Sequence, residues 1–143
     1  MALIIAEMTE KDLPALRELF LKVRQKTFFW LDNSSYNLSS FDKETDGEYI
    51  MVAYLNQVVV GFVSLYSPDN FIHNLYVHTD YQNQGVGTAL LKAAIIQMAP
   101  LPVRLKCLKE NKNAVAFYEK NGFQAKSQGI SYEGIYILFE YES

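Results

Sequence analysis

The sequence predicts an α/β (α+β) fold with a mixed, mostly antiparallel central sheet and helices on both faces. Short runs rich in β-branched and aromatic residues recur along the chain, and most are joined by hairpin-like turns. Segments of helical periodicity separate them at several places, which indicates helices packed on both sides of the sheet. The 143 residues, 50% of them hydrophobic, contain no repeat or linker. We therefore expect residues 1–143 to form one domain with a sizeable core.

The first half of the chain opens with a strand and a helix. Residues 3–7 are the expected strand, and Thr9 then serves as an N-cap, with Asp12 three residues later and Pro14 in the first turn. Apolar residues at helical spacing follow, from Leu13 to Val23, and predict one buried stripe. The remaining expected elements of this half are a loop at 33–47, hairpin strands at 48–55 and 58–66, and a turn at 67–70.

The second half alternates strands and helices before a final pair of strands. Its expected elements are a strand at 71–77, a helix that follows two glycines and reaches Met98, a strand at 103–108, a helix at 113–120, and strands around 123–126 and 135–141. Pro100 and Pro102 separate the first of these helices from the next strand. Asn121-Gly122 is a standard stop for the second helix.

Composition excludes several function classes. The net charge is −3 and no long Lys/Arg cluster occurs, so nucleic acid is not expected as a direct partner. No stretch approaches the roughly 18–20 uninterrupted apolar residues of a membrane span, and no basic region precedes the apolar N-terminal run, as a signal peptide would require. The single cysteine, Cys107, allows neither an intramolecular disulfide nor a cysteine-rich metal site. We expect a cytoplasmic protein without a metal, in which Cys107 is packed in the interior.

Two glycines, Gly85 and Gly87, stand immediately before a strongly apolar helical run. They indicate that another group comes close to the backbone at this point, and a phosphate is one candidate for that group. A P-loop is excluded because no lysine precedes Thr88, and a dinucleotide fingerprint is excluded because Leu90 is not small. The remaining pattern is Gln82-x-x-Gly-x-Gly. Taken alone, the glycines could equally well do no more than shape a strand-to-helix turn.

This pattern resembles the acyl-CoA pyrophosphate loop of the GNAT N-acetyltransferase superfamily. The preceding segment "NLYVHTDYQ" (74–82) is similar to the fourth strand of that family, and "LKENKNAVAFYEKNGF" (108–123) is similar to its second signature. Residues 8–20 also have the strand-to-helix opening usual in the family. The resemblance thus covers nearly the whole chain in the right order.

The resemblance implies that acetyl-CoA, as cosubstrate, lies between two splayed parallel strands at 71–77 and 103–108. Main-chain groups of 75–77 would bond the pantetheine arm, and N–H groups of 82–88 would hold the pyrophosphate. Gln82 stands where the family often has arginine, which implies less charge assistance. The implied cofactor-binding set is Leu75, Tyr76, Val77, Gln82, Asn83, Gln84, Gly85, Val86, Gly87, Thr88, Asn111 and Tyr118. Asn111 could also simply cap the short helix that follows it.

The implied chemistry is attack by a neutral amine on a thioester, which needs a base for the ammonium and an acid for the leaving sulfur. The resemblance makes Tyr118 the acid; the plainer interpretation is a tyrosine packed on the sheet. His73 is the first candidate for the base, because histidine titrates near neutral pH. The plainer interpretation is that His73 faces a polar neighbour. Glu48 is a second candidate, although an exposed strand-end carboxylate explains it as well. His78 reads as a loop residue.

In this family the acceptor is chosen by the region after the first helix and by the terminal hairpin. Here these regions carry aromatic and acidic residues. Phe28 and Phe29 are expected in the core, whereas Trp30 suits a pocket wall. The expected substrate-binding set is Trp30, Tyr36, Glu48, His73 and Tyr132. An acidic surround of Asp32, Asp42, Asp46, Glu48 and Glu133 would favour a cationic amine, but a solvated acidic loop has the same composition.

The resulting prediction is an N-acetyltransferase that moves an acetyl group from acetyl-CoA to a primary amine, on a small molecule or a protein, by direct attack in a ternary complex. A homodimer is possible, since relatives are often dimers. A non-catalytic acyl-CoA-binding regulatory module is the alternative; it would keep the glycine loop without a productive acceptor pocket. A structural interaction domain with a degenerate cleft is the third interpretation.

Overall fold

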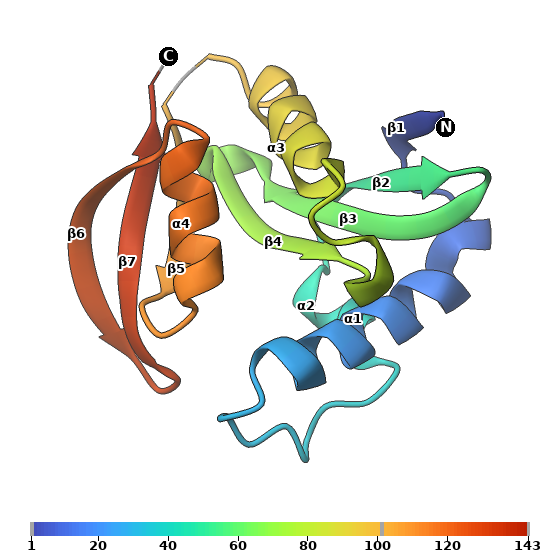
Figure 1. The fold of residues 1–143 in the computed structure, drawn as a ribbon, viewed down its shortest axis with the longest axis horizontal. Coiled ribbons are helices and arrows are strands. Elements are labelled where there is room, and N and C mark those ends of the chain that lie inside the picture. Colours follow the sequence, from blue (N-terminus) through green and yellow to red (C-terminus); the bar gives the residue numbers. More distant parts are fainter. Residues whose placement is uncertain (1, 101, 143) are drawn as a thin grey trace.

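The computed structural model describes residues 2–100 and 102–142, which form one seven-stranded sheet in the order β1-β2-β3-β4-β5-β7-β6 (Figure 1). All neighbouring strands are antiparallel except β4 and β5, which are parallel. The strands are β1 (Leu3–Glu7), β2 (Tyr49–Leu55), β3 (Val58–Tyr66), β4 (Phe71–Val77), β5 (Val103–Leu108), β6 (Gln124–Ser131) and β7 (Gly134–Tyr141). The helices are α1 (Leu13–Thr27), α2 (Ser40–Glu44), α3 (Val86–Gln97) and α4 (Lys112–Lys120), with 3₁₀ turns η1 (Glu10–Asp12), η2 (Ser67–Asp69) and η3 (Thr79–Tyr81). The predicted fold class is confirmed.

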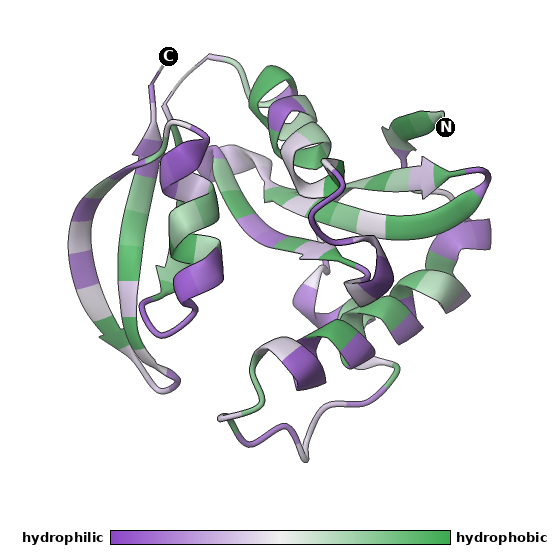
Figure 2. Cartoon of the chain, viewed as in Figure 1, coloured by the Kyte–Doolittle hydropathy of each residue, from purple (hydrophilic) through white to green (hydrophobic). Residues whose placement is uncertain are grey.

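Two cores lie on opposite faces of the sheet. Alternate residues of β2 divide between them, with Met51 and Ala53 on one side and Ile50 and Val52 on the other, as the two-residue period of a strand requires. The first core also takes in buried residues of α3 and α4, and the second takes in those of α1 and α2. Hydrophobic and hydrophilic residues alternate along α1, as expected for a helix with one buried stripe (Figure 2).

The sheet splits between β4 and β5. Only two residue pairs join these strands, Phe71 with Arg104 and Ile72 with Leu105. Beyond these pairs β4 curves away from β5, so that the two halves of the sheet diverge (Figure 1). The remaining main-chain groups of β4 therefore face β3 on one side and have no strand neighbour on the other among the described residues. The expected splay of two parallel strands is confirmed.

The entry into α1 follows the predicted cap, with one added turn. The Asp12 carboxylate accepts hydrogen bonds from the Thr9 main-chain N–H at 2.9 Å and from the Tyr54 hydroxyl at 2.5 Å. These bonds explain how a carboxylate is buried at this position. The η1 turn lies between Thr9 and the start of α1 at Leu13.

Two segments differ from the sequence expectation. The expected loop at 33–47 contains α2, because Phe41 is fully buried against the rings of Phe20 and Phe62. Tertiary packing of this kind overrides a weak local preference for a loop. The strand expected at 123–126 extends through Ser131 as β6. It is an edge strand with mostly exposed residues, so its sequence lacks the apolar alternation that predicts a strand.

The residues described hold no helix long and apolar enough to cross a membrane. They also contain no group of three or more His, Cys, Asp or Glu side chains arranged to hold a metal ion.

Stability is expected to fall as the pH rises above about 9, because several buried groups hold their protons more tightly in the folded state. Burial raises the pKa of Cys107 from 9.0 to about 12, and burial raises that of Tyr76 from 10.0 to about 12. The unfolded chain therefore loses these protons first, and the stability present below pH 9 is lost between about 9 and 12. Urea unfolding across this pH range measures the fall, and Cys107→Ala is expected to make it shallower. Equal slopes for both proteins would contradict the assignment.

Candidate functional site

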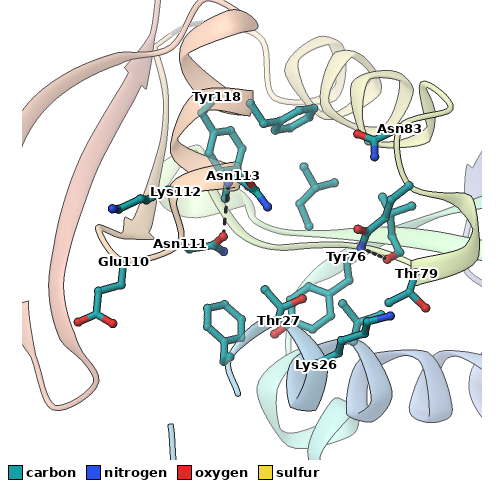
Figure 3. Close-up of a pocket in the computed structure, with 18 of the residues that line it drawn as sticks. Lys26, Thr27, Tyr76, Thr79, Asn83, Glu110, Asn111, Lys112, Asn113 and Tyr118 are labelled. Atoms are coloured by element: carbon teal, nitrogen blue, oxygen red, sulfur yellow. Dashed lines mark hydrogen bonds between the residues drawn. The ribbon is translucent and has the colours of Figure 1, made fainter. Parts of the chain in front are cut away.

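A cavity of about 970 Å³ occupies the split in the sheet (Figure 3). Its walls come from the second half of β4, the turn that leads into α3, the first turns of α3, most of α4 and the last turn of α1. Elements from both halves of the sheet thus meet around one space, which is large enough for a sizeable ligand.

The two glycines at the start of α3 serve different purposes. Gly85 is the N-cap residue and has a φ of +84°, a conformation that residues with a Cβ rarely adopt. A Cβ at Gly85 would meet nothing within 4 Å, so the space beside it is open. A Cβ at Gly87 would lie 3.3 Å from the Phe117 ring and 3.7 Å from Val77, which fixes how closely α4 approaches α3. No side chain of the described residues caps this 12-residue helix, so its first N–H groups have no side-chain acceptor there.

Most of the residues predicted to bind the cofactor line this one cavity. They are Leu75, Tyr76, Val77, Gln82, Asn83, Gly85, Gly87, Thr88, Asn111 and Tyr118. Gln84 and Val86 do not line it. The Gln84 side chain instead donates to the Asp80 carbonyl at 3.3 Å, and Val86 is buried in the core. Gln82 lines the cavity while its side-chain amide donates to the Val77 carbonyl at 3.1 Å, which ties the turn to the end of β4.

Tyr118 on α4 combines packing with a place in the cavity wall. Its ring packs near Phe123 and Phe139, with ring centroids 5.8 and 6.0 Å away. The side chain is largely buried yet forms part of the cavity lining. Burial raises the pKa of the hydroxyl, and the neighbouring Cys107 raises it further. The phenol is therefore neutral at physiological pH and able to donate a hydrogen bond or a proton into the cavity.

Asn111 fulfils the helix-capping role that its sequence position suggests. Its side-chain oxygen accepts from the Ala114 main-chain N–H at 3.4 Å and caps α4. The bond uses only the oxygen, and Asn111 also lines the cavity (Figure 3). The amide N–H groups are thus the part of this side chain that a ligand could engage.

The two candidate bases form one pair outside the cavity. His73 Nδ1 lies 2.6 Å from Glu48 Oε2. A register shift between Ser64 and Leu65 makes His73 the extra residue of β4. Neither residue lines the cavity. His73 is next to Ile72, where the pairing of β4 with β5 ends, so the pair sits beside the point of the split.

Glu48 is not the exposed strand-end carboxylate that its sequence position suggested as the plainer interpretation. Its side chain is only 9% exposed, and Oε1 has no hydrogen-bond partner among the residues described. A buried carboxylate with a free oxygen is unusual enough to indicate a functional role or an unseen partner. His78, in contrast, accepts from the Asp80 N–H and caps η3.

The expected acceptor residues separate into three groups. Trp30 lines the cavity at the end of α1 and packs edge-on against Phe28 and Phe29. Tyr36 lies outside it, with its ring 3.9 Å from the Arg24 guanidinium carbon. Tyr132 is 92% exposed at the tip of the β6–β7 hairpin. The core interpretation of Phe28 and Phe29 is wrong. Phe28 is only half-buried and Phe29 is 78% exposed, because α1 ends at Thr27, and both line the cavity.

The acidic residues do not form one surround. Asp42 makes a two-point ion pair with Arg17, and the Asp32 carboxylate accepts from the Ser34 N–H, which lowers its pKa. Glu133 pairs with Arg24. These engagements leave less free negative charge near the cavity than the sequence count suggests.

Sequence reasoning missed the cations of this region. Lys26 on α1 and both Lys112 and Lys120 on α4 line the cavity, whereas Glu110 is the acidic side chain in its wall. The three lysines belong to two helices far apart in the sequence, so no sequence motif predicts that they line one cavity. The burial of Arg24 in α1 was also not predicted, because the apolar residues around it account for the buried stripe by themselves.

Comparisons with known proteins agree with this geometry. Residues 11–123 match the model of the acetyltransferase (GNAT) family. An uncharacterized N-acetyltransferase of Methanocaldococcus jannaschii is 38% identical over 58 residues, which are 38% of this chain and 26% of that protein's length. The PaiA N-acetyltransferase of Thermoplasma acidophilum in complex with coenzyme A has a TM-score of 0.86 at 21% identity and full coverage of both chains. A GNAT family acetyltransferase of Elizabethkingia anophelis with acetyl-CoA bound has a TM-score of 0.78 at 20% identity, covering 99% of this chain and 98% of that one.

Proposed function

We propose that this chain, which belongs to the acetyltransferase (GNAT) family, transfers an acetyl group from acetyl-CoA to a primary amine by direct attack in a ternary complex. One observation carries the proposal: a single cavity joins the start of α3, where a phosphate would bind, to the neutral hydroxyl of Tyr118. An anion-binding end and a proton donor in one space fit an acyl-CoA donor.

The residues present suit the donor. The free N–H groups at the start of α3 and the positive end of its dipole would hold the pyrophosphate, and the open space beside Gly85 leaves room for it. Lys26, Lys112 and Lys120 add positive charge around the same cavity. They offset the neutral Gln82, at which the family often has arginine. The main-chain groups of β4 exposed by the split would bond the pantetheine arm.

The chemistry assigns one task to each group. The amine nitrogen forms a bond to the acetyl carbonyl carbon, the carbon–sulfur bond breaks, and the amine loses a proton to a base. Tyr118 donates its proton to the departing sulfur, and burial suits it to this task because the raised pKa keeps the phenol protonated until the thiolate develops. Main-chain N–H groups of β4 that the split leaves without a partner on β5 would stabilise the oxyanion.

We assign the base to the His73–Glu48 pair, in which Glu48 orients and polarises the imidazole; His73 does not line the cavity and would take the proton through water. His73→Gln is expected to lower kcat/KM about 100-fold or more and to remove the acidic limb of its pH profile. The effect on the affinity for acetyl-CoA should be small, because His73 does not line the cavity. Glu48→Gln is expected to give a smaller loss. A pH–rate profile with an unchanged acidic limb would remove the pair from the mechanism.

The proposal is tested by two measurements on the intact chain. Titration calorimetry with acetyl-CoA measures donor binding, and a screen of primary amines followed by release of free thiol measures transfer. Binding with thiol release is the expected result. Binding without release from any amine would favour the acyl-CoA-binding regulatory module instead, and no binding would contradict both. The identity of the acceptor, a cytoplasmic location and a homodimer stay predictions.

A further inference from the structure

Arg24 is a buried cation on the acceptor side of the site. Its side chain is only 8% exposed, and its Nη2 lies 2.5 Å from Oε2 of Glu133. Glu133 belongs to the turn between β6 and β7, so this contact joins α1 to a hairpin 109 residues later. The contact therefore links α1, which packs on the half of the sheet that contains β2 and β3, to the β6–β7 hairpin of the other half.

The guanidinium of Arg24 is only partly used. Its Nε is buried and has no hydrogen-bond partner in the described part of the chain. Arg17, on the same helix but outside the walls of the cavity, shows the complete arrangement: Nε donates to Asp42 Oδ1 at 2.9 Å and Nη2 to Oδ2 at 2.8 Å. A planar guanidinium fits a carboxylate through two such parallel bonds. Glu133 supplies only one of them to Arg24, and a carboxylate better placed would supply both.

Aromatic rings fix the orientation of this guanidinium. Its central carbon lies 3.9 Å from the ring centroid of Tyr36 and 5.2 Å from that of Phe28. Stacking leaves the edge of the guanidinium as the place where an anion binds. Burial lowers the pKa of Arg24, but the contact with Glu133 and the nearby hydroxyls of Tyr76 and Tyr36 raise it overall, so the group is charged.

Arg24 lies next to residues that line two cavities. Arg24 itself lines neither cavity, but the adjacent Val23, and Phe28 and Tyr76 beside its guanidinium, line the large one. A second cavity of about 330 Å³ lies between Trp30 and the start of β7, and Glu133 lines it. Trp30 belongs to the walls of both cavities. Glu133 thus lines the second cavity and Tyr118 the large one, and Trp30 is common to both.

We infer that the acceptor amine carries a carboxylate, which Arg24 binds through both Nε and Nη2 in the place that Glu133 holds in the free protein. This inference rests on the proposed function and narrows its acceptor to the amino-acid class. The rings of Phe28, Trp30 and Tyr36 make an apolar or aromatic side chain the best fit. Glu133, on a hairpin turn and partly exposed, moves aside when the substrate binds.

The test uses pairs of ligands that differ only in the carboxylate: phenylalanine with phenethylamine, leucine with isopentylamine, and glycine with methylamine. Calorimetry of the CoA-saturated protein is expected to show at least one amino acid binding about 10- to 100-fold more tightly than its amine, because an amine would leave the buried guanidinium edge unsatisfied. Glu133→Gln should strengthen binding of that amino acid several-fold, since it removes the competing carboxylate, and should not change binding of the amine.

Arg24→Lys is expected to abolish the preference for the amino acid, because an ammonium cannot make the two parallel bonds. Arg17→Lys, the same change at the exposed pair on the same helix, is the matched control and should leave the preference intact. Acetyl-CoA affinity and thermal unfolding check that each variant is folded. The Arg24 Nε–H resonance gives a direct signal, which should shift when the amino acid binds and not when the amine binds.

Three other outcomes would overturn the inference. If no pair shows a preference for the carboxylate, Arg24 is not an anchor. If amines bind more tightly and Glu133→Gln weakens them, Glu133 recognises an ammonium instead. Thiol release separates these results from a failure of the proposed function: release with amines but not amino acids removes the inference alone. Carboxylate-dependent binding without release from any acceptor keeps the Arg24 site and removes the acetyltransferase proposal.

Discussion

Gly85→Glu is expected to abolish measurable binding of acetyl-CoA. The substitution acts in two ways at the start of α3. The φ of +84° forces a residue with a Cβ into a conformation that is less favourable by about 1–2 kcal/mol. The new carboxylate also projects into the open space beside residue 85, where it would take the anion's place at the positive end of the helix and repel the pyrophosphate. Together these effects predict an affinity at least about 100-fold weaker, measured by titration calorimetry.

Gly47→Glu is the matched control for this variant. Gly47 also has a left-handed φ, +76°, and a Cβ there would also meet nothing within 4 Å. It lies before β2 and outside the cavity. Both variants should therefore lose a similar few degrees of melting temperature, while only Gly85→Glu loses acetyl-CoA. Gly85→Ala carries the strain without the charge and should lose far less affinity than Gly85→Glu. Unchanged binding by Gly85→Glu would mean that the glycine serves the turn alone.

Most of the sheet could be predicted from the sequence because its strands have recognisable local patterns of apolar residues. The runs at 48–55 and 58–66 are apolar on both faces, as strands covered by helices on both sides must be. Each lies next to its partner in the chain, so the hairpin follows from its turn. The edge strand β6 was predicted too short, because its exposed residues carry no apolar alternation. The position of helix α2 within the loop-like region at 33–47 was not assigned, because the helix depends on burial of Phe41 by residues distant in the sequence.

The candidate site likewise has a part that continuous motifs predict and a part that only folding brings together. The glycine turn, Asn111 and Tyr118 belong to two continuous motifs, and folding brings both to one cavity. The proposed acceptor side consists of single residues from separate elements: Arg24 of α1 contacts Glu133 of the last hairpin, and Glu48 before β2 contacts His73 of β4. No spacing along the chain relates such pairs. Glu48 and His73 were named as rival bases, and only the structure shows that they are partners.

Tyr118→Phe is expected to lower kcat about 100-fold or more, with little change in the affinity for acetyl-CoA. The change removes the hydroxyl and keeps the ring, so the packing against Phe123 and Phe139 is retained. Without the phenol, the sulfur must leave as an unprotonated thiolate or take its proton from water. Kinetics under saturating acetyl-CoA and acceptor, together with calorimetry and thermal unfolding of the variant, measure the three quantities separately.

The dependence on pH distinguishes a proton donor from a packing residue. Because burial raises the Tyr118 pKa above its ordinary value of 10.0, the wild-type rate should not fall through loss of this proton at any pH below 10. Tyr66→Phe, at the exposed end of β3 and outside the cavity, is the control for loss of a tyrosine hydroxyl and should keep the wild-type rate. A Tyr118→Phe enzyme with the wild-type kcat would show that α4 contributes only packing and that the leaving sulfur receives its proton from another source. The Tyr118 hydroxyl would then be a buried, neutral polar group with no role in the reaction, like the neighbouring Cys107 thiol.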